Sequence, residues 1–209
     1  MVDDRAGAGD GVVLIHGWPG DRNDYREVAT LLTGCTVVVP DLRGFGESDK
    51  HPATPAGAYS ADAQARSVVG LIDELGLGQA VVAGYDVGGR VAQTVARSFP
   101  DRVRALVASP PLPGAGKRVL EPDAEREFRY QPFHQLSLAE VTSARDERIA
   151  VPTTVLWPEF DPSFPLAWGD RLGEFFADAT LTSLPAWATS SRSKRPVTSR
   201  PRSAPPSPL

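Results

Sequence analysis

The sequence predicts an α/β fold in which a mostly parallel β-sheet is covered by helices on both faces. Two observations predict it: two kinds of segment alternate along the chain, and the chain has the length and apolar content to bury a core. Short apolar stretches, typical of buried strands, alternate along the chain with segments whose apolar residues recur at helical spacing. Strands that follow one another in this rhythm are joined by helical crossovers, which makes them parallel and buries both of their faces. A chain of 209 residues, 41% of them hydrophobic, is long enough for one domain with its own core.

The first half of the chain contains four apolar stretches, most of them followed by a turn rich in glycine or proline. They predict strands at 11–15, 35–39, 81–85 and 103–108. Between these strands, apolar residues recur at the spacing of amphipathic helices. The helices are expected at 25–32, from a cap at Ser60 or Asp62 to about Leu75, and from the turn after the third strand to about Phe99.

The alternation breaks after Ser109 and resumes with an expected strand at 153–157, a helix at 166–176 and a last strand at 179–184. The intervening residues, 110–149, form an irregular or helical insertion. Residues 185–209 hold six serines, six prolines and five basic residues but no acidic one, a composition too poor in apolar residues to fold. We therefore expect a core of residues 1–109 and 150–184, an insertion at 110–149 and a disordered basic tail.

Charge and composition exclude several classes of function. The net charge is −4, and the tail holds five of the 22 basic residues and none of the 26 acidic ones, so the rest of the chain is more acidic still. No nucleic-acid partner is expected. The single Cys35 excludes an internal disulfide, and no cluster has the spacing of metal ligands. The polar N-terminal segment resembles neither a signal peptide nor a membrane span, so we expect a cytoplasmic protein without membrane contact.

Residues 84–89 read Gly-Tyr-Asp-Val-Gly-Gly and join an apolar strand directly to a helix. This is the layout of a nucleophile elbow, which exposes one side chain at a sharp bend. Glycine is needed at Gly84 and Gly88 because a Cβ atom there would collide with the neighbouring strand or helix. The exposed residue is then Asp86, whose carboxylate can attack carbon without a base to activate it. The alternative is a glycine-rich turn in which Asp86 is an ordinary helix N-cap.

Four motifs follow one another along residues 11–184: His16-Gly17-Trp18-Pro19, the D-x-R-G-x-G-x-S loop at 41–48, the elbow at 84–89, and Phe160-Asp161-Pro162. Together they resemble the α/β-hydrolase fold family, and specifically its branch with an aspartate nucleophile, the epoxide hydrolases and haloalkane dehalogenases. The resemblance implies an open, mostly parallel sheet with its site at the carboxyl ends of the strands. It also implies that the insertion at 110–149 is a shortened cap.

The resemblance further implies a hydrolase that uses water, without cofactor or metal, on a small apolar epoxide or halogenated substrate. Asp86 would form an ester with the substrate. Backbone N–H groups of Trp18 and Val87 would hold the oxyanion that forms when water attacks this ester, and His16 would support the loop without transferring protons. The residues implied to bind the oxyanion or the substrate are His16, Gly17, Trp18, Pro19, Tyr85 and Val87.

Two further catalytic residues are implied. Asp161 would orient a histidine that activates water, and Tyr130, in the aromatic part of the insertion, would protonate the oxygen of the opened epoxide. The alternatives are that Asp161 only forms a turn before Pro162 and that Tyr130 only packs the cap on the core. Haloalkane dehalogenases usually have tryptophan after the nucleophile and haloacetate dehalogenases have arginine. Val87 supplies neither, so an epoxide hydrolase is favoured and a dehalogenase is the alternative.

Three departures from the family pattern stand out. Only ten residues precede the first expected strand, where the family has a hairpin, and the tail lacks the family's final helix, so we expect truncation at both ends. The insertion is also shorter than a full cap. None of the histidines (His16, His51 and His134) follows the last strand, where the family places its catalytic base. Codons read one base earlier from about residue 186 are compatible with the family's histidine loop, which suggests a frameshift. A catalytically dead relic or small-ligand binder is therefore a second alternative, and the oligomeric state stays open.

Overall fold

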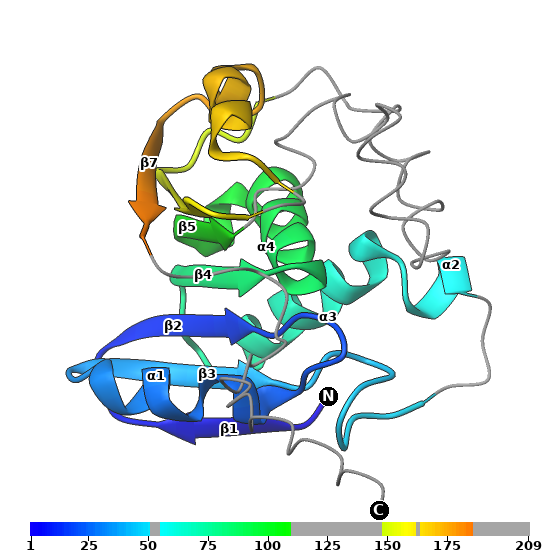
Figure 1. Ribbon diagram of the computed structural model, residues 1–209. Coiled ribbons are helices and arrows are strands. Elements are labelled where there is room, and N and C mark those ends of the chain that lie inside the picture. The colour runs from blue at the N-terminus through cyan, green and yellow to red at the C-terminus, as the bar shows by residue number, and fades with distance from the viewer. Residues whose placement is uncertain (51–54, 110–147, 162–163, 186–209) are drawn as a thin grey trace, which may run out of the picture.

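The computed structural model describes residues 1–50, 55–109, 148–161 and 164–185. These residues form a seven-stranded sheet with the order β1-β3-β2-β4-β5-β6-β7 (Figure 1). The pairings from β3 to β7 are parallel, and β1 runs antiparallel to β3. The strands are β1 (Asp3–Ala6), β2 (Asp10–Ile15), β3 (Cys35–Pro40), β4 (Ala80–Tyr85), β5 (Val103–Ser109), β6 (Thr153–Pro158) and β7 (Ala179–Leu184).

Helices connect the strands in the alternation that the sequence predicts. Within the described residues, none is long and apolar enough to cross a membrane. The Ser60 side chain accepts a hydrogen bond from the amide of Ala63, so Ser60 is the cap of the second expected helix and Asp62 lies in its first turn. The helices are η1 (Arg22–Tyr25), α1 (Arg26–Leu31), α2 (Pro55–Ala58), α3 (Ala61–Glu74), α4 (Val87–Ser98), η2 (Pro100–Arg102) and η4 (Leu166–Glu174).

The α/β fold with a mostly parallel sheet is confirmed, and six strands lie within one residue of their predicted bounds. Two elements differ. The strand β1 was not predicted, because an edge strand with mostly exposed residues carries no apolar signal, and it supplies an antiparallel strand where the sequence suggested a missing hairpin. The element η4 is a 3₁₀ helix and not the expected α-helix. The predicted cap with Tyr130, and the tail from 186, lie outside the described residues.

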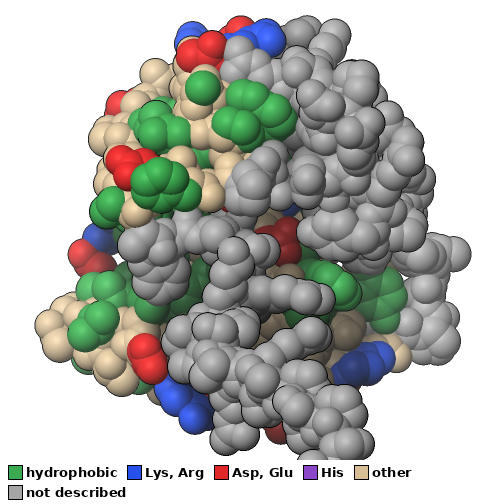
Figure 2. Space-filling model, viewed as in Figure 1, with side chains coloured by type: hydrophobic (Ala, Val, Ile, Leu, Met, Phe, Trp, Pro, Cys, Tyr) green, Lys and Arg blue, Asp and Glu red, His purple; other side chains and the backbone are tan. Residues whose placement is uncertain are grey.

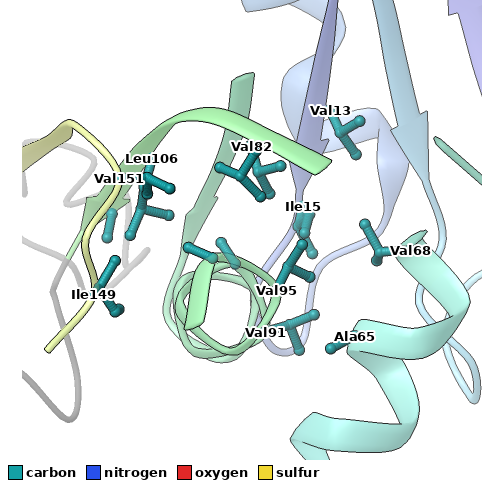
Figure 3. Packing of buried hydrophobic residues seen from close by; sticks show 14 of the residues in the cluster. Val13, Ile15, Ala65, Val68, Val82, Val91, Val95, Leu106, Ile149 and Val151 are labelled. Carbon is teal, nitrogen blue, oxygen red and sulfur yellow. The ribbon is translucent and has the colours of Figure 1, made fainter. Parts of the chain in front are cut away.

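Helices cover the two faces of the sheet unequally. On one face, α3 and α4 pack on a large cluster of buried side chains that includes Val13, Val82 and Leu106, as Figure 3 shows. On the other face, α1 and the adjacent loop cover a smaller cluster over β2 and β3 that includes Leu14 and Val39. Successive side chains of a strand point to opposite faces of the sheet, so neighbouring residues of β4 contribute to different clusters.

The N-terminus of α4 lies unusually close to the sheet. A Cβ atom added to Gly84 would lie 2.8 Å from the backbone nitrogen of Gly89, and one added to Gly88 would lie 2.7 Å from the carbonyl carbon of Ile15. Both distances are shorter than atoms can approach without moving the backbone. The prediction that the elbow requires glycine at these two positions is therefore confirmed, and the close packing brings the start of α4 to the end of β2.

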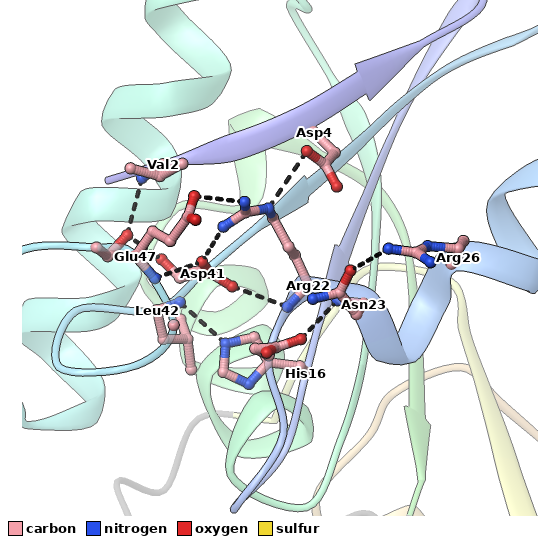
Figure 4. A network of polar contacts seen from close by, with 12 residues as sticks. Val2, Asp4, His16, Arg22, Asn23, Arg26, Asp41, Leu42 and Glu47 are labelled. Atoms are coloured by element: carbon pink, nitrogen blue, oxygen red, sulfur yellow. Dashed lines mark hydrogen bonds and ion pairs between the residues drawn. The ribbon is translucent and has the colours of Figure 1, made fainter.

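A buried polar network fixes the loops that follow β2 and β3 (Figure 4). The carboxylate of Asp41, which is fully buried, accepts hydrogen bonds from the amides of Arg22 (2.8 Å) and Glu47 (2.9 Å) and forms an ion pair with the Arg22 guanidinium. The same guanidinium bonds Glu47 at 2.6 Å and Asp4 of β1 at 3.2 Å. The D-x-R-G-x-G-x-S loop thus anchors β1 and the loop after β2 to the sheet.

Candidate active site

Asp86 connects β4 to α4 in a strained backbone conformation. Its φ is 52° and its ψ is −124°, and it is the one non-glycine residue with positive φ in the described part of the chain. Such conformations persist only where the surroundings hold them in place, here by an amide hydrogen bond from Asp86 to the Ser109 carbonyl at 3.0 Å. The Asp86 side chain makes no capping hydrogen bond with α4. The alternative of an ordinary N-cap is therefore wrong.

The carboxylate of Asp86 turns toward the loop after β2. The backbone N–H of Trp18 donates a hydrogen bond to its Oδ2 atom at 3.0 Å. Gly17 is needed here, because a Cβ atom would lie 2.6 Å from the Tyr85 ring and 2.8 Å from the Cβ of Asp86. The sequence-predicted loop and elbow are therefore brought into direct contact, although they lie 68 positions apart.

The environment of Asp86 has two opposing effects on the pKa of its carboxyl group. Burial raises the pKa of its carboxyl group, while the nearby backbone amides of Trp18 and Val87 lower it. Burial has the larger effect, so the pKa lies above the usual value of 3.8. A carboxylate with few solvating partners is a more reactive nucleophile than one in water.

His16 is buried, and backbone groups occupy both nitrogens of its ring. Its Nε2 accepts a hydrogen bond from the amide of Leu42 at 3.0 Å, and its Nδ1 lies 2.9 Å from the carbonyl oxygen of Gly17. The ring also meets Phe45 edge-on, with centroids 5.2 Å apart. Because the Leu42 amide needs Nε2 as an acceptor, the geometry supports the structural role predicted for His16 and leaves no nitrogen free to activate water.

Tyr85 precedes Asp86 but points to the opposite face of the sheet, the face covered by α1. Its hydroxyl donates a hydrogen bond to Oδ2 of Asp24 in η1 at 2.6 Å. Burial, followed by this hydrogen bond and the charge of Asp24, raises the pKa of Tyr85 well above its usual range. The predicted substrate contact of Tyr85 stays a prediction, because the structure places its side chain beneath the loop that carries Gly17.

Asp161 follows β6, two strands away from β4, and is 4% exposed. Its Oδ1 accepts a hydrogen bond from the amide of Phe164 at 3.1 Å, as expected of a turn-forming aspartate. The role of orienting a histidine stays a prediction, because the histidine that the structure describes, His16, is held by the loops after β2 and β3. Tyr130 lies outside the described residues.

Two aromatic side chains within the motifs are exposed. On the face shown in Figure 2, hydrophobic side chains are exposed at the surface of the described residues. The exposed large ones include Trp18 (54% exposed), in the loop after β2, and Phe160 (72%), after β6. Exposed aromatic rings at the carboxyl ends of strands are suited to an apolar small molecule. In the described residues, no group of three histidine, cysteine or acidic side chains could hold a metal ion.

Sequence reasoning missed Arg22 and Asp24, which hold the loop after β2 from two sides. Both lie in a polar stretch with no periodicity and no motif of their own. Their partners, Asp41 and Tyr85, are 19 and 61 positions away. No local signal in the sequence could have paired them.

Comparisons with known proteins agree with this architecture. The family model described as the alpha/beta hydrolase fold matches residues 11–137. Epoxide hydrolase 1 of Siraitia grosvenorii is 30% identical over 191 residues, which cover 88% of this chain and 59% of the relative. A soluble epoxide hydrolase of Corynebacterium sp. is 37% identical over 110 residues, which cover 52% of this chain and 37% of the relative. The chain thus spans less than two thirds of the length of these curated relatives.

A solved structure, a variant of an epoxide hydrolase from Bacillus megaterium, superimposes with a TM-score of 0.74. It covers 90% of this chain and 89% of the other at 16% identity, so it supports the fold alone. The parallel sheet, the strained elbow packed against the loop after β2, and the family match over residues 11–137 lead to one conclusion. This chain belongs to the α/β-hydrolase fold family.

Proposed function

We propose that the chain is an epoxide hydrolase-type hydrolase in which Asp86 attacks a ring carbon of a small apolar epoxide. The observation that carries this proposal is the carboxylate at the elbow, which is strained, desolvated and held by the Trp18 amide at 3.0 Å. Aspartate at this position suits substitution at carbon better than acyl transfer. The epoxide hydrolases among the relatives support the substrate class.

In the first half-reaction, an oxygen of Asp86 forms a bond to the ring carbon and the carbon–oxygen bond of the epoxide breaks. The released oxygen carries a negative charge and takes a proton, for which Tyr130 is the proposed donor. In the second half-reaction, water attacks the carbonyl carbon of the ester. The amides of Trp18 and Val87 stabilise the oxyanion that forms, and the ester bond then breaks. The departing diol oxygen takes the proton that the base removed from water, and the Asp86 carboxyl group returns its proton to the tyrosinate left by the first half-reaction.

The second half-reaction needs a base to deprotonate water. Backbone groups occupy both ring nitrogens of His16, and none of the three histidines in the sequence follows β7. Asp161, the residue proposed to orient the base, therefore has no histidine in its predicted place. We expect the ester on this chain to form and then persist, with slow hydrolysis at most.

Intact-protein mass spectrometry after incubation with small epoxides and haloalkanes tests the proposal, with Asp86→Asn as the matched variant. The expected result is an epoxide adduct on the parent chain, localised to Asp86 by peptide mapping, and none on Asp86→Asn. An adduct with haloalkanes alone, with release of halide, would assign the chain to the dehalogenases. Diol without adduct would reveal a base other than the predicted histidine. A folded protein that gives neither adduct nor product would be a relic or a binder, and the proposal would be wrong.

A further inference from the structure

Tyr85 and Asp24 form a contact that the mechanism above does not use. The Tyr85 hydroxyl donates to the Asp24 carboxylate at 2.6 Å, on the face of the sheet opposite to α3 and α4. Tyr85 is covalently joined to Asp86, and Asp24 lies at the far end of the loop that carries Trp18. The pair therefore joins the two segments that meet at the candidate site.

The loop is folded tightly around this contact. A Cβ atom on Gly17 would lie 2.6 Å from the Tyr85 ring, and one on Gly20 would lie 2.9 Å from the Tyr85 hydroxyl. Tyr25 packs edge-on against the Tyr85 ring with centroids 5.9 Å apart. The loop from Gly17 to Gly20 thus packs directly on the ring and hydroxyl of Tyr85.

We propose that Tyr85 and Asp24 are a positioning pair, which holds the loop so that the Trp18 amide lies at the carboxylate of Asp86. This inference rests on the proposed role of Asp86 and adds to it two residues that set the geometry of the amide donor. On its other side the loop is held by Arg22, which bonds the buried carboxylate of Asp41. The Trp18 side chain is 54% exposed and so contributes little packing that could fix its own amide.

The environment of Tyr85 keeps its hydroxyl protonated, so that it acts as the donor to Asp24. Burial raises the pKa of Tyr85, the hydrogen bond to Asp24 and the charges of Asp24 and Asp86 raise it further, and the Gly17 amide opposes them. The hydroxyl therefore keeps its proton at neutral pH and acts as the donor. Its acceptor is a carboxylate, which makes the hydrogen bond stronger than one between neutral groups.

Substitutions can separate the hydrogen bond from the packing. Tyr85→Phe and Asp24→Ala each remove the contact, whereas Asp24→Asn keeps an oxygen that accepts from the Tyr85 hydroxyl. Tyr25→Phe is the matched control, because it removes a hydroxyl from the neighbouring ring, one bonded to the Ile15 carbonyl at 3.1 Å, and leaves the pair intact. Two measurements apply to every variant: the rate at which an epoxide labels Asp86, and the NMR shift of the Trp18 amide as Asp86 titrates.

In the parent, the Trp18 amide signal should move with pH as Asp86 ionises. In Tyr85→Phe and Asp24→Ala, this movement should fall by at least about half, and labelling of Asp86 should slow about tenfold, because a small misplacement of a catalytic donor is costly. The pH at half-maximal labelling should rise, since the amide that favours the ionised carboxylate is lost. Tyr25→Phe should resemble the parent, and Asp24→Asn should lie between the parent and Asp24→Ala, because its amide oxygen is a weaker acceptor. The double variant Tyr85→Phe/Asp24→Ala should be no slower than either single variant.

The two measurements test the positioning role and the proposed reaction separately. If Asp86 of the parent is never labelled but its Trp18 amide loses the pH response in Tyr85→Phe and Asp24→Ala, the pair positions the loop and the proposed reaction is wrong. If the amide keeps its full response in both variants, the positioning role is wrong, whatever the rate of labelling. Equal effects of Tyr25→Phe and Tyr85→Phe would also overturn it, because general loosening of the aromatic contact would then explain both.

Discussion

Replacement of Gly88 by alanine tests whether the close packing of α4 on β2 sets the shape of the elbow. A Cβ atom at this position would lie 2.7 Å from the carbonyl carbon of Ile15, and closer still to the carbonyl oxygens of Ile15 and His16. Real Cβ atoms essentially never come within 3.0 Å of such neighbours. Because all three neighbours are backbone atoms of β2 and its loop, no side chain can rotate away, and α4 itself has to move.

The expected loss of stability follows from two opposing effects. Overpacking of a dense interior costs roughly 1–3 kcal/mol, and contacts with backbone atoms place Gly88 at the upper end. Alanine in place of glycine inside a helix gains about 0.5–1 kcal/mol. We therefore expect Gly88→Ala to lower the free energy of unfolding by about 2 kcal/mol.

Gly70→Ala provides the matched control. Gly70 is also a helical glycine, in α3, but it is exposed and a Cβ atom there would meet nothing within 4 Å. This variant should be more stable than the parent by about 0.5–1 kcal/mol. The free energy of unfolding is measured by urea denaturation, followed by the fluorescence of the buried Trp157.

The comparison between the two alanine variants decides the outcome. The steric argument is refuted if Gly88→Ala is as stable as Gly70→Ala, because the same substitution in two helices would then cost the same with and without neighbours. A stable Gly88→Ala variant with unchanged labelling of Asp86 would further show that the elbow does not depend on this contact.

Three further predictions concern buried polar groups. Burial raises the pKa of Asp41, but backbone amides and the Arg22 guanidinium outweigh it and hold the pKa below 3.8, so this carboxylate stabilises the fold at neutral pH and the gain is lost as pH falls through the lowered pKa. Asp41→Asn should be less stable at pH 7 and lose less stability toward pH 2, which urea denaturation across this pH range measures. Trp157→Phe should cost about 2–3 kcal/mol in free energy of unfolding, since it leaves a void and removes the donor to the Phe164 carbonyl, now 2.7 Å away. Burial raises the pKa of Asp86, so its ionised form destabilises the fold above that pKa. Asp86→Asn should be more stable than the parent at pH 7, and an equal or lower melting temperature there would contradict this.

Local signals predicted most of the fold. The strands β2 to β6 were found because buried parallel strands are short apolar stretches between turns, and α3 because a serine cap precedes an amphipathic repeat. The edge strand β7 was found as well, although its residues are mostly exposed. The prediction of secondary structure failed where the spacing of apolar residues does not reveal the element. The edge strand β1 is polar and mostly exposed, and η4 differs from an α-helix by hydrogen bonding that its apolar spacing does not reveal.

Within the candidate site, the sequence could predict what sterics and chemistry require locally. The glycines of the elbow and the choice of a carboxylate at Asp86 belong to this class, because a Cβ atom at Gly84 or Gly88 collides in any chain that makes this turn. The sequence alone also shows that residues 185–209, which follow β7, contain no histidine. That fact needs no structure and shapes the expected chemistry most.

Only the tertiary structure decided which distant groups meet. The Tyr85 hydroxyl pairs with Asp24, and the Trp18 amide with Asp86, across 61 and 68 positions of sequence. His16 is committed to Leu42 through a hydrogen bond across 26 positions. Partners so far apart are chosen by the order and register of β2, β3 and β4, which depend on the whole sheet. Residue type tells which bonds a side chain can make, and packing of the strands determines which of them it makes.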